Sequence, residues 1–79
     1  MNPVPERNLG EQPILRVMAR HGVTAHDVVS ASPEPMTHKM VARAGKGRWL
    51  TPHARIKVRN ALNRAVNGTY GLEELFTYH

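Results

Sequence analysis

Several features that mark familiar classes of protein are missing from this sequence. It has no cysteine, which excludes disulfide bonds and thiolate metal sites. No apolar run approaches the roughly 20 residues that a membrane-spanning helix needs. The N-terminus lacks the basic-then-apolar pattern of a secretory leader. We therefore expect a protein that works in the cytoplasm.

Acidic residues are missing from the middle of the chain. The six acids are Glu6, Glu11, Asp27, Glu34, Glu73 and Glu74. The acid-free stretch between Glu34 and Glu73 holds eight of the eleven basic residues: Lys39, Arg43, Lys46, Arg48, Arg55, Lys57, Arg59 and Arg64. A segment so one-sided repels itself and attracts polyanions. The alternative is a solvated surface that happens to be basic.

Signatures of enzymes and of metal sites are missing as well. No nucleophile motif, Walker loop or glycine-rich dinucleotide turn is present, and the neighbours Glu73 and Glu74 would point in different directions on a helix. The histidines lack metal-ligand spacing; they are His21, His26, His38, His53 and His79. We expect neither catalysis, nor a cofactor, nor a bound metal.

Apolar periodicity and capping signals predict an all-α domain. Residues 1–9 hold two prolines and no periodicity, so we expect a flexible N-terminal arm followed by one domain over 10–79, with a thin core. The first predicted helix runs from about Glu11 to His21 and stops at Gly22. The second starts at the N-cap Thr24 and is over before Pro33.

The second half of the chain predicts two further helices and a short last turn. Ser32–Met36 forms a turn, and Thr37 caps a helix that reaches about Lys46. Thr51 and Pro52 are a fitting N-cap and first residue for the next helix. Its apolar stripe consists of Ala54, Val58, Ala61, Leu62 and Ala65. Asn67-Gly68 ends it, and Leu72–Phe76 makes a final helical turn, which brings the total to four or five short helices.

The helix over Thr37–Lys46 has two different sides. At about 100° per residue, small and apolar residues gather on one side and cations on the other. The first side carries Met40, Val41, Ala44 and Gly45; the second carries Lys39, Arg43 and Lys46, with His38 and Ala42 at its edges. The small residues allow close packing on neighbouring helices, and the cations are left for a ligand or for solvent.

From Val23 to Leu62 the chain resembles the lambda-repressor-like (Cro/phage-repressor, XRE-type) helix-turn-helix domain. The residues that carry the resemblance are Val23-Thr24, Val28-Val29, Thr37, Val41, Ala44, Gly47-Arg48, Thr51-Pro52 and Ala61-Leu62. The segment Leu72–Phe76 resembles the short fifth helix of that family. The turn at 32–36 is about two residues longer than the usual one and lacks its common glycine.

The resemblance implies sequence-specific binding of double-stranded DNA by a small prokaryotic or phage transcriptional regulator, nucleoid-associated when bound. Helix 37–46 would read the major groove. The implied base-reading residues are His38, Lys39 and Arg43, and the implied phosphate contacts are Thr37, Lys46 and Arg48. We expect two further phosphate contacts from Thr24, at a helix N-terminus that favours phosphate, and from Arg55, a cation of the helix that follows. A homodimer could form through Leu75, Phe76 and Tyr78, which could equally cap the core.

Two other classes of function remain open from the sequence. A protein-interaction adaptor on the same fold would dock through helix 37–46 or through the Phe76–Tyr78 end. RNA binding is disfavoured because only 5% of residues are aromatic, which leaves few rings for stacking on single-stranded bases. Trp49 is interpreted as a lid on the core, with packing beside a nucleic-acid backbone as the alternative.

Overall fold

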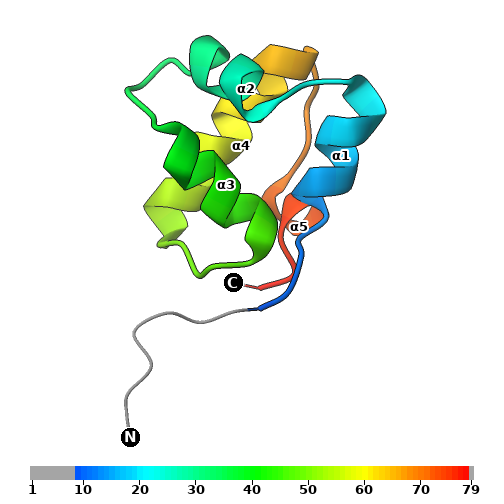
Figure 1. The fold of residues 1–79 in the computed structure, drawn as a ribbon, viewed down its shortest axis with the longest axis vertical. Helices are drawn as coiled ribbons and strands as arrows, with labels where there is room; N and C mark the ends of the chain where they lie inside the picture. The colour runs from blue at the N-terminus through cyan, green and yellow to red at the C-terminus, as the bar shows by residue number, and fades with distance from the viewer. Residues whose placement is uncertain (1–8, 79) are drawn as a thin grey trace, which may run out of the picture.

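The computed structural model of the protein describes residues 9–78. Within that range the chain forms five helices and no β-strand, which confirms the predicted all-α class. The helices are α1 (Ile14–His21), α2 (Ala25–Ala31), α3 (His38–Lys46), α4 (Pro52–Val66) and α5 (Leu72–Leu75) (Figure 1). The predicted arm, except Leu9, lies outside the described residues. Each helix of this range is too short or too polar to cross a membrane.

The three threonine N-caps lie where the sequence predicts them. Thr24 Oγ1 accepts from the Asp27 N–H at 3.2 Å, and Asp27 Oδ2 accepts from the Thr24 N–H at 2.8 Å, so α2 begins with a reciprocal capping box. The backbone and side-chain hydrogen bonds from Thr24 hold the pKa of Asp27 below its ordinary value. The Thr37 and Thr51 side chains also cap their helices, by accepting from the Met40 and Ala54 N–H groups, but without the return hydrogen bond of a capping box. Each cap satisfies a backbone donor that the helix itself cannot pair.

The first helix begins later than the periodicity predicts. It starts at Ile14, three residues after Glu11, and Pro13 is its N-cap. Proline disfavours helical backbone in the residue before it, so Gln12 is released from the helix. The Gln12 N–H instead donates to the Gly45 carbonyl at 3.0 Å. The start of α1 is thereby attached to the C-terminal part of α3.

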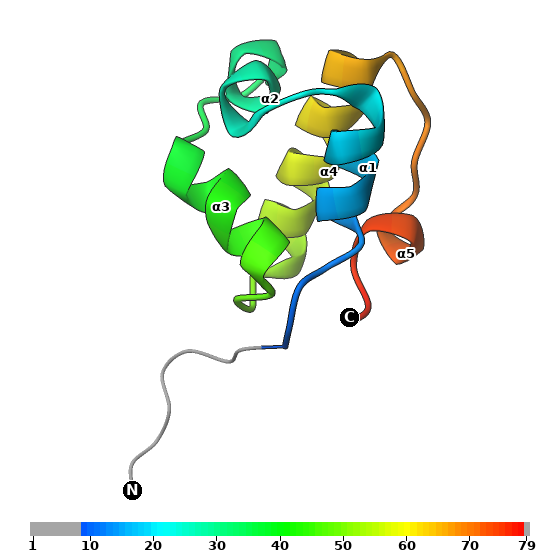
Figure 2. The same ribbon diagram turned by 45° about the vertical axis from the view of Figure 1, so that its right-hand side comes forward.

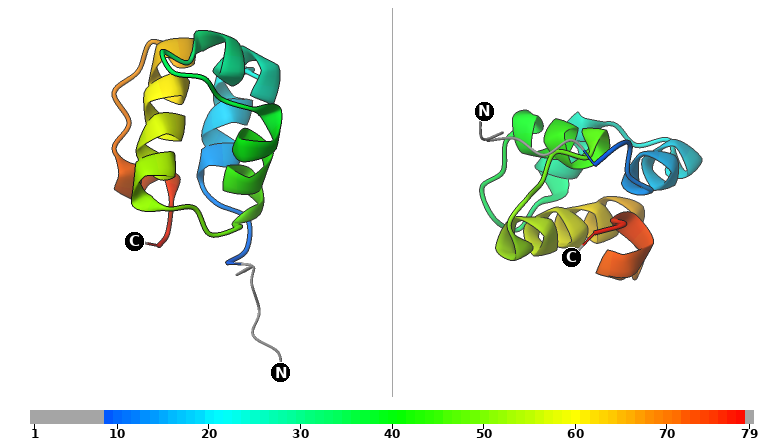
Figure 3. Two further views of the ribbon diagram at one scale, coloured as in Figure 1. Left: turned by 90° about the vertical axis from the view of Figure 1, so that its left-hand side faces the viewer. Right: turned by 90° about the horizontal axis from the view of Figure 1, so that it is seen from below.

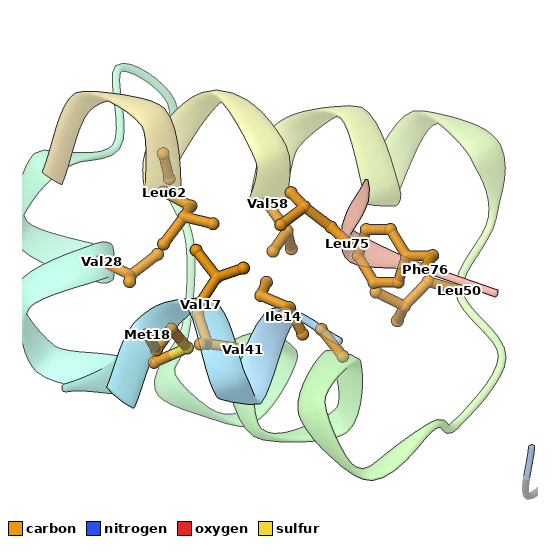
Figure 4. Packing of buried hydrophobic residues seen from close by; sticks show 12 residues of the cluster. Ile14, Val17, Met18, Val28, Val41, Leu50, Val58, Leu62, Leu75 and Phe76 are labelled. Carbon is orange, nitrogen blue, oxygen red and sulfur yellow. The ribbon is translucent and has the colours of Figure 1, made fainter. Parts of the chain in front are cut away.

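The core forms around α4, whose buried side faces the other helices. Val58, Ala61 and Leu62 on α4 are fully buried. They pack in one cluster with apolar side chains of α1, α2, α3, the connector between α3 and α4, α5 and the C-terminal tail: Ile14, Val17, Met18, Val28, Val41, Ala44, Leu50, Leu75 and Phe76 (Figure 4). Burying one such Val or Leu side chain stabilises the fold by about 1.5–3 kcal/mol. Seen from below in Figure 3, α1, α2 and α3 lie to one side of α4, with α5 beside it.

A buried glutamine connects segments that are distant in sequence. Gln12 is 2% exposed. Its Oε1 accepts from the Thr77 N–H at 2.7 Å and from the Thr77 hydroxyl at 3.0 Å, and its Nε2 donates to the Gly10 carbonyl at 2.9 Å. With its own N–H on Gly45, this one residue joins the start of the domain, α3 and the C-terminal tail.

Gly47 ends α3 at a point where the chain near the N-terminus comes very close. Its φ of 85° lies in the left-handed region, and the Leu9 N–H donates to its carbonyl at 2.8 Å. A Cβ at position 47 would lie 1.7 Å from the Gly10 carbonyl oxygen. In two views the chain at residues 9–12 runs past the C-terminal end of α3 (Figures 1 and 2). Only glycine satisfies both constraints.

Gly47→Ala is expected to destabilise the fold more than Gly22→Ala does. Both glycines end a helix with positive φ, but a Cβ at Gly22 would meet nothing within 4 Å. Gly22→Ala should therefore cost only the backbone strain, about 1–2 kcal/mol. Gly47→Ala adds a clash with backbone at Gly10, so its cost should clearly exceed that of the control. Urea unfolding followed by circular dichroism measures both; equal losses would contradict the close approach.

Candidate nucleic-acid interface

The two sides of α3 are separated as the sequence predicts. Val41 and Ala44 are buried in the core at 2% and 0% exposure, and Leu15 of α1 covers Gly45, where a Cβ would lie 2.6 Å from Leu15 Cδ2. The opposite side is open to solvent, with Arg43 half-buried and the others exposed: His38, Lys39, Ala42 and Lys46. Close packing on one side thus determines which side chains face outward.

The cations of α3 surround a hollow in the surface of about 240 Å³. We call it the basic hollow; it is lined by Lys39, Ala42, Arg43, Lys46 and Arg48. Arg48 joins it because the turn at Gly47 folds the chain back, and the Arg48 N–H donates to the Arg43 carbonyl at 3.0 Å. Three of these cations come from one helix and the fourth from the connector to α4. Four cations around one hollow attract an anion.

The N-terminal end of α3 faces α2. His38, the first residue of α3, meets His26 of α2, with His38 Nε2 and His26 Nδ1 3.3 Å apart. Thr37 is exposed, and its hydroxyl oxygen accepts from the Met40 N–H at 3.1 Å, which leaves its hydrogen to donate elsewhere. The sequence carries no local signal for this pair, because His26 and His38 are brought together only by the folding of the 32–37 connector.

Thr24 is exposed, but its hydroxyl is already hydrogen-bonded to Asp27. The hydroxyl donates to Asp27 Oδ2 at 3.1 Å while its oxygen accepts from the Asp27 N–H. A phosphate here would compete with a carboxylate that already holds the only side-chain donor of Thr24. The predicted phosphate contact at Thr24 is therefore poorly placed, whereas Thr37 and Lys46 are exposed and Arg48 is half-buried beside the basic hollow.

The burial of Arg55 contradicts its prediction as a phosphate contact on this surface. Arg55 is 5% exposed, its Nη1 donates to the Tyr78 carbonyl at 2.9 Å, and its Cζ lies 4.7 Å from the centre of the Tyr78 ring. Its Nε is buried without a hydrogen-bond partner among the described residues. Arg55 lies at the edge of the apolar stripe of α4, three residues before Val58, so its stem packs inward against the tail. A phosphate cannot reach this guanidinium.

The C-terminal tail fills the core of its own chain. Leu75 and Phe76 are 0% and 3% exposed, so the predicted dimer patch is not available, and of the two alternatives the core cap is confirmed. Tyr78 is half-buried; its hydroxyl accepts from the Leu50 N–H at 3.1 Å and donates to the Arg48 carbonyl at 3.4 Å. The tail thereby supports the connector that carries Arg48.

Trp49 lies in the same connector and is not one of the buried residues of the core cluster. It is 36% exposed, whereas its neighbour Leu50 is buried at 7% and enters the core in its place. Trp49 is therefore neither fully buried nor fully open to solvent. An aromatic ring therefore stands on the surface next to Arg48.

Two further observations bear on the chemistry of the chain. Within residues 9–78, no three histidine, aspartate or glutamate side chains gather closely enough to hold a metal ion. A comparison of this chain with protein families, with curated proteins and with solved structures found no match.

Arg55→Ala and Lys46→Ala are expected to differ sharply in their effect on stability, although each removes one positive charge. Arg55→Ala removes a buried stem, a hydrogen bond and a cation–π contact, and should lower the free energy of unfolding by about 2 kcal/mol. Lys46→Ala removes an exposed side chain and should change it by less than about 0.5 kcal/mol. Urea unfolding measures both values, and similar values for the two variants would refute the burial of Arg55.

Proposed function

We propose that the protein binds double-stranded DNA and reads its sequence by placing α3 in the major groove. The observation that carries the proposal is the basic hollow on the exposed side of a helix whose other side is fixed in the core. A polyanion fits four clustered cations. A groove fits a helix whose outward face is not obstructed by bulky side chains.

The positions of the cations suit two kinds of contact. Lys39 and Arg43 lie one turn apart on α3, and the small residue Ala42 lines the same hollow. Lysine and arginine so placed can donate to guanine O6 and N7. Lys46 and Arg48 lie at the C-terminal end of α3, where the helix would leave the groove and approach the backbone. We assign base reading to Lys39 and Arg43, with His38 beside them, and phosphate contact to Lys46, Arg48 and Thr37.

The arrangement of α2, the 32–37 connector and α3 supports the resemblance to lambda-repressor-like helix-turn-helix domains. In both, a helix capped by a polar residue precedes the reading helix, and α2 and α3 of this chain are in contact. We therefore propose a small transcriptional regulator of prokaryotic or phage type. Its contact surface would be α3 and the residue that follows its terminal glycine.

The affinity for duplex DNA should fall steeply with salt. Lys46 and Arg48 as phosphate contacts predict a slope of about −2 in a log–log plot of association constant against salt, and the two cations in the groove should make it steeper. Lys46→Ala should make that slope shallower by about 1. Fluorescence anisotropy across a salt series measures both. Binding that ignores salt, or binding to single-stranded RNA in preference to duplex DNA, would argue for another function.

Arg43→Ala should reduce sequence discrimination rather than general affinity. A duplex selected from a random library provides the specific site, and a shuffled duplex provides the comparison. The variant should lose about 1–3 kcal/mol on the selected duplex and much less on the shuffled one. Arg20→Ala on α1 removes the same side chain from outside the basic hollow and should change neither. Equal losses on both duplexes would make Arg43 a phosphate contact instead.

A further inference from the structure

Two imidazole rings meet between α2 and α3 at the edge of the proposed DNA-binding surface. His26 Nδ1 and His38 Nε2 are 3.3 Å apart, within hydrogen-bonding distance, and the ring planes differ by only 17°. Both residues are exposed. His26 Nε2 also lies 3.5 Å from the Ser30 hydroxyl, one turn further along α2. The pair links the supporting helix to the first residue of the proposed reading helix.

An N–H···N bond between two imidazoles restricts their protonation states. One of the two facing nitrogens must carry hydrogen and the other must keep its lone pair. Two neutral rings satisfy this condition, and so does one neutral ring with one cationic ring, but two cationic rings do not. The link between α2 and α3 therefore survives the uptake of one proton and is broken by a second.

The bond also determines what His38 offers to DNA. In the neutral pair, His38 Nδ1 is a donor if His38 Nε2 accepts from His26, and an acceptor if Nε2 donates. After the pair takes up one proton, three of its four nitrogens carry hydrogen. The lone pair then belongs to one of the two facing nitrogens, so His38 Nδ1 is always a donor. His38 then presents an N–H at the start of α3, as part of a pair that carries one positive charge.

We propose that His26 is a positioning residue for His38, and that the His26–His38 pair takes up one proton when the protein binds DNA. The inference rests on the DNA-binding function proposed above. Phosphates favour the cationic form of the pair, and the extra proton supplies a donor for a phosphate or for guanine N7. Affinity for DNA therefore increases as the pH falls through the range in which histidine titrates.

Positively charged groups outnumber negatively charged ones around the pair in the free protein. Asp27 on α2 interacts with His26 and favours a cation there, but it is already bound to Thr24. Glu34 lies in the connector. Lys39 and Arg43 on α3 oppose a further positive charge, as does Arg64 of α4, which donates to the Ala31 carbonyl at the end of α2. DNA would reverse this balance, because its phosphates outnumber the nearby carboxylates.

The test compares DNA affinity at pH 8 and pH 6, at constant ionic strength, for the wild type and His26→Gln on the selected duplex. One linked proton changes affinity by at most about tenfold per pH unit, so the wild type should bind several-fold to tenfold more tightly at pH 6. Glutamine keeps hydrogen-bonding groups but cannot take up the proton, so His26→Gln should bind at pH 8 and lose most of the increase. His53→Gln, on the exposed start of α4, should keep it.

A second measurement separates this inference from the proposed function. Nitrogen-15 NMR of the ring nitrogens in the free protein should show His26 and His38 titrating in a coupled manner, and His38→Gln should change the titration of His26 but not of His53. If the rings are coupled but no DNA is bound, the proposed function has failed and the proton linkage to DNA fails with it. If DNA is bound and His26→Gln retains the full pH dependence, the inference alone is overturned.

Discussion

The packing of α4 against the other helices is the constraint on which the proposed binding surface depends. Val58, Ala61 and Leu62 are fully buried, and they meet a side of α3 that consists largely of small residues. Ala44 and Gly45 let the backbone of α3 approach its neighbours closely, and Leu15 occupies the space that a side chain at Gly45 would need. Rotating α3 would bury a cation or expose Val41. The outward direction of Lys39, Arg43 and Lys46 is thus a consequence of how the core is filled.

Most of the helix boundaries could be predicted because their signals are local. Thr24, Thr37 and Thr51 each cap a helix by accepting from a backbone N–H only three residues further on. Gly22 and Gly47 each end a helix with a positive φ. The two sides of α3 could be predicted for the same reason, since helical periodicity alone separates its cations from its small residues. These features require no knowledge of what lies across the core.

Contacts between distant segments could not be predicted from the sequence. An arginine is usually exposed, but the guanidinium of Arg55 is covered by Tyr78, which lies 23 residues further along the chain. Nothing in the sequence around Gln12 indicates that it is buried, because its partner Thr77 lies 65 residues away in the tail. His26 and His38 likewise become a pair only because the connector between α2 and α3 folds back. Each of these side chains has a role that depends on the path of a segment elsewhere in the chain.

The free protein is already arranged for the contact that we propose. Arg43 and Lys46 lie in the last turn of α3, where the negative end of the helix dipole offsets part of their repulsion. Both ends of α3 are held by caps, its inner side lies in the core, and the Tyr78 hydroxyl supports the connector that carries Arg48. Little backbone ordering would therefore oppose binding, and more of the contact energy would appear as affinity. Preorganised support of this kind distinguishes a basic helix that can read a groove from one that is only solvated.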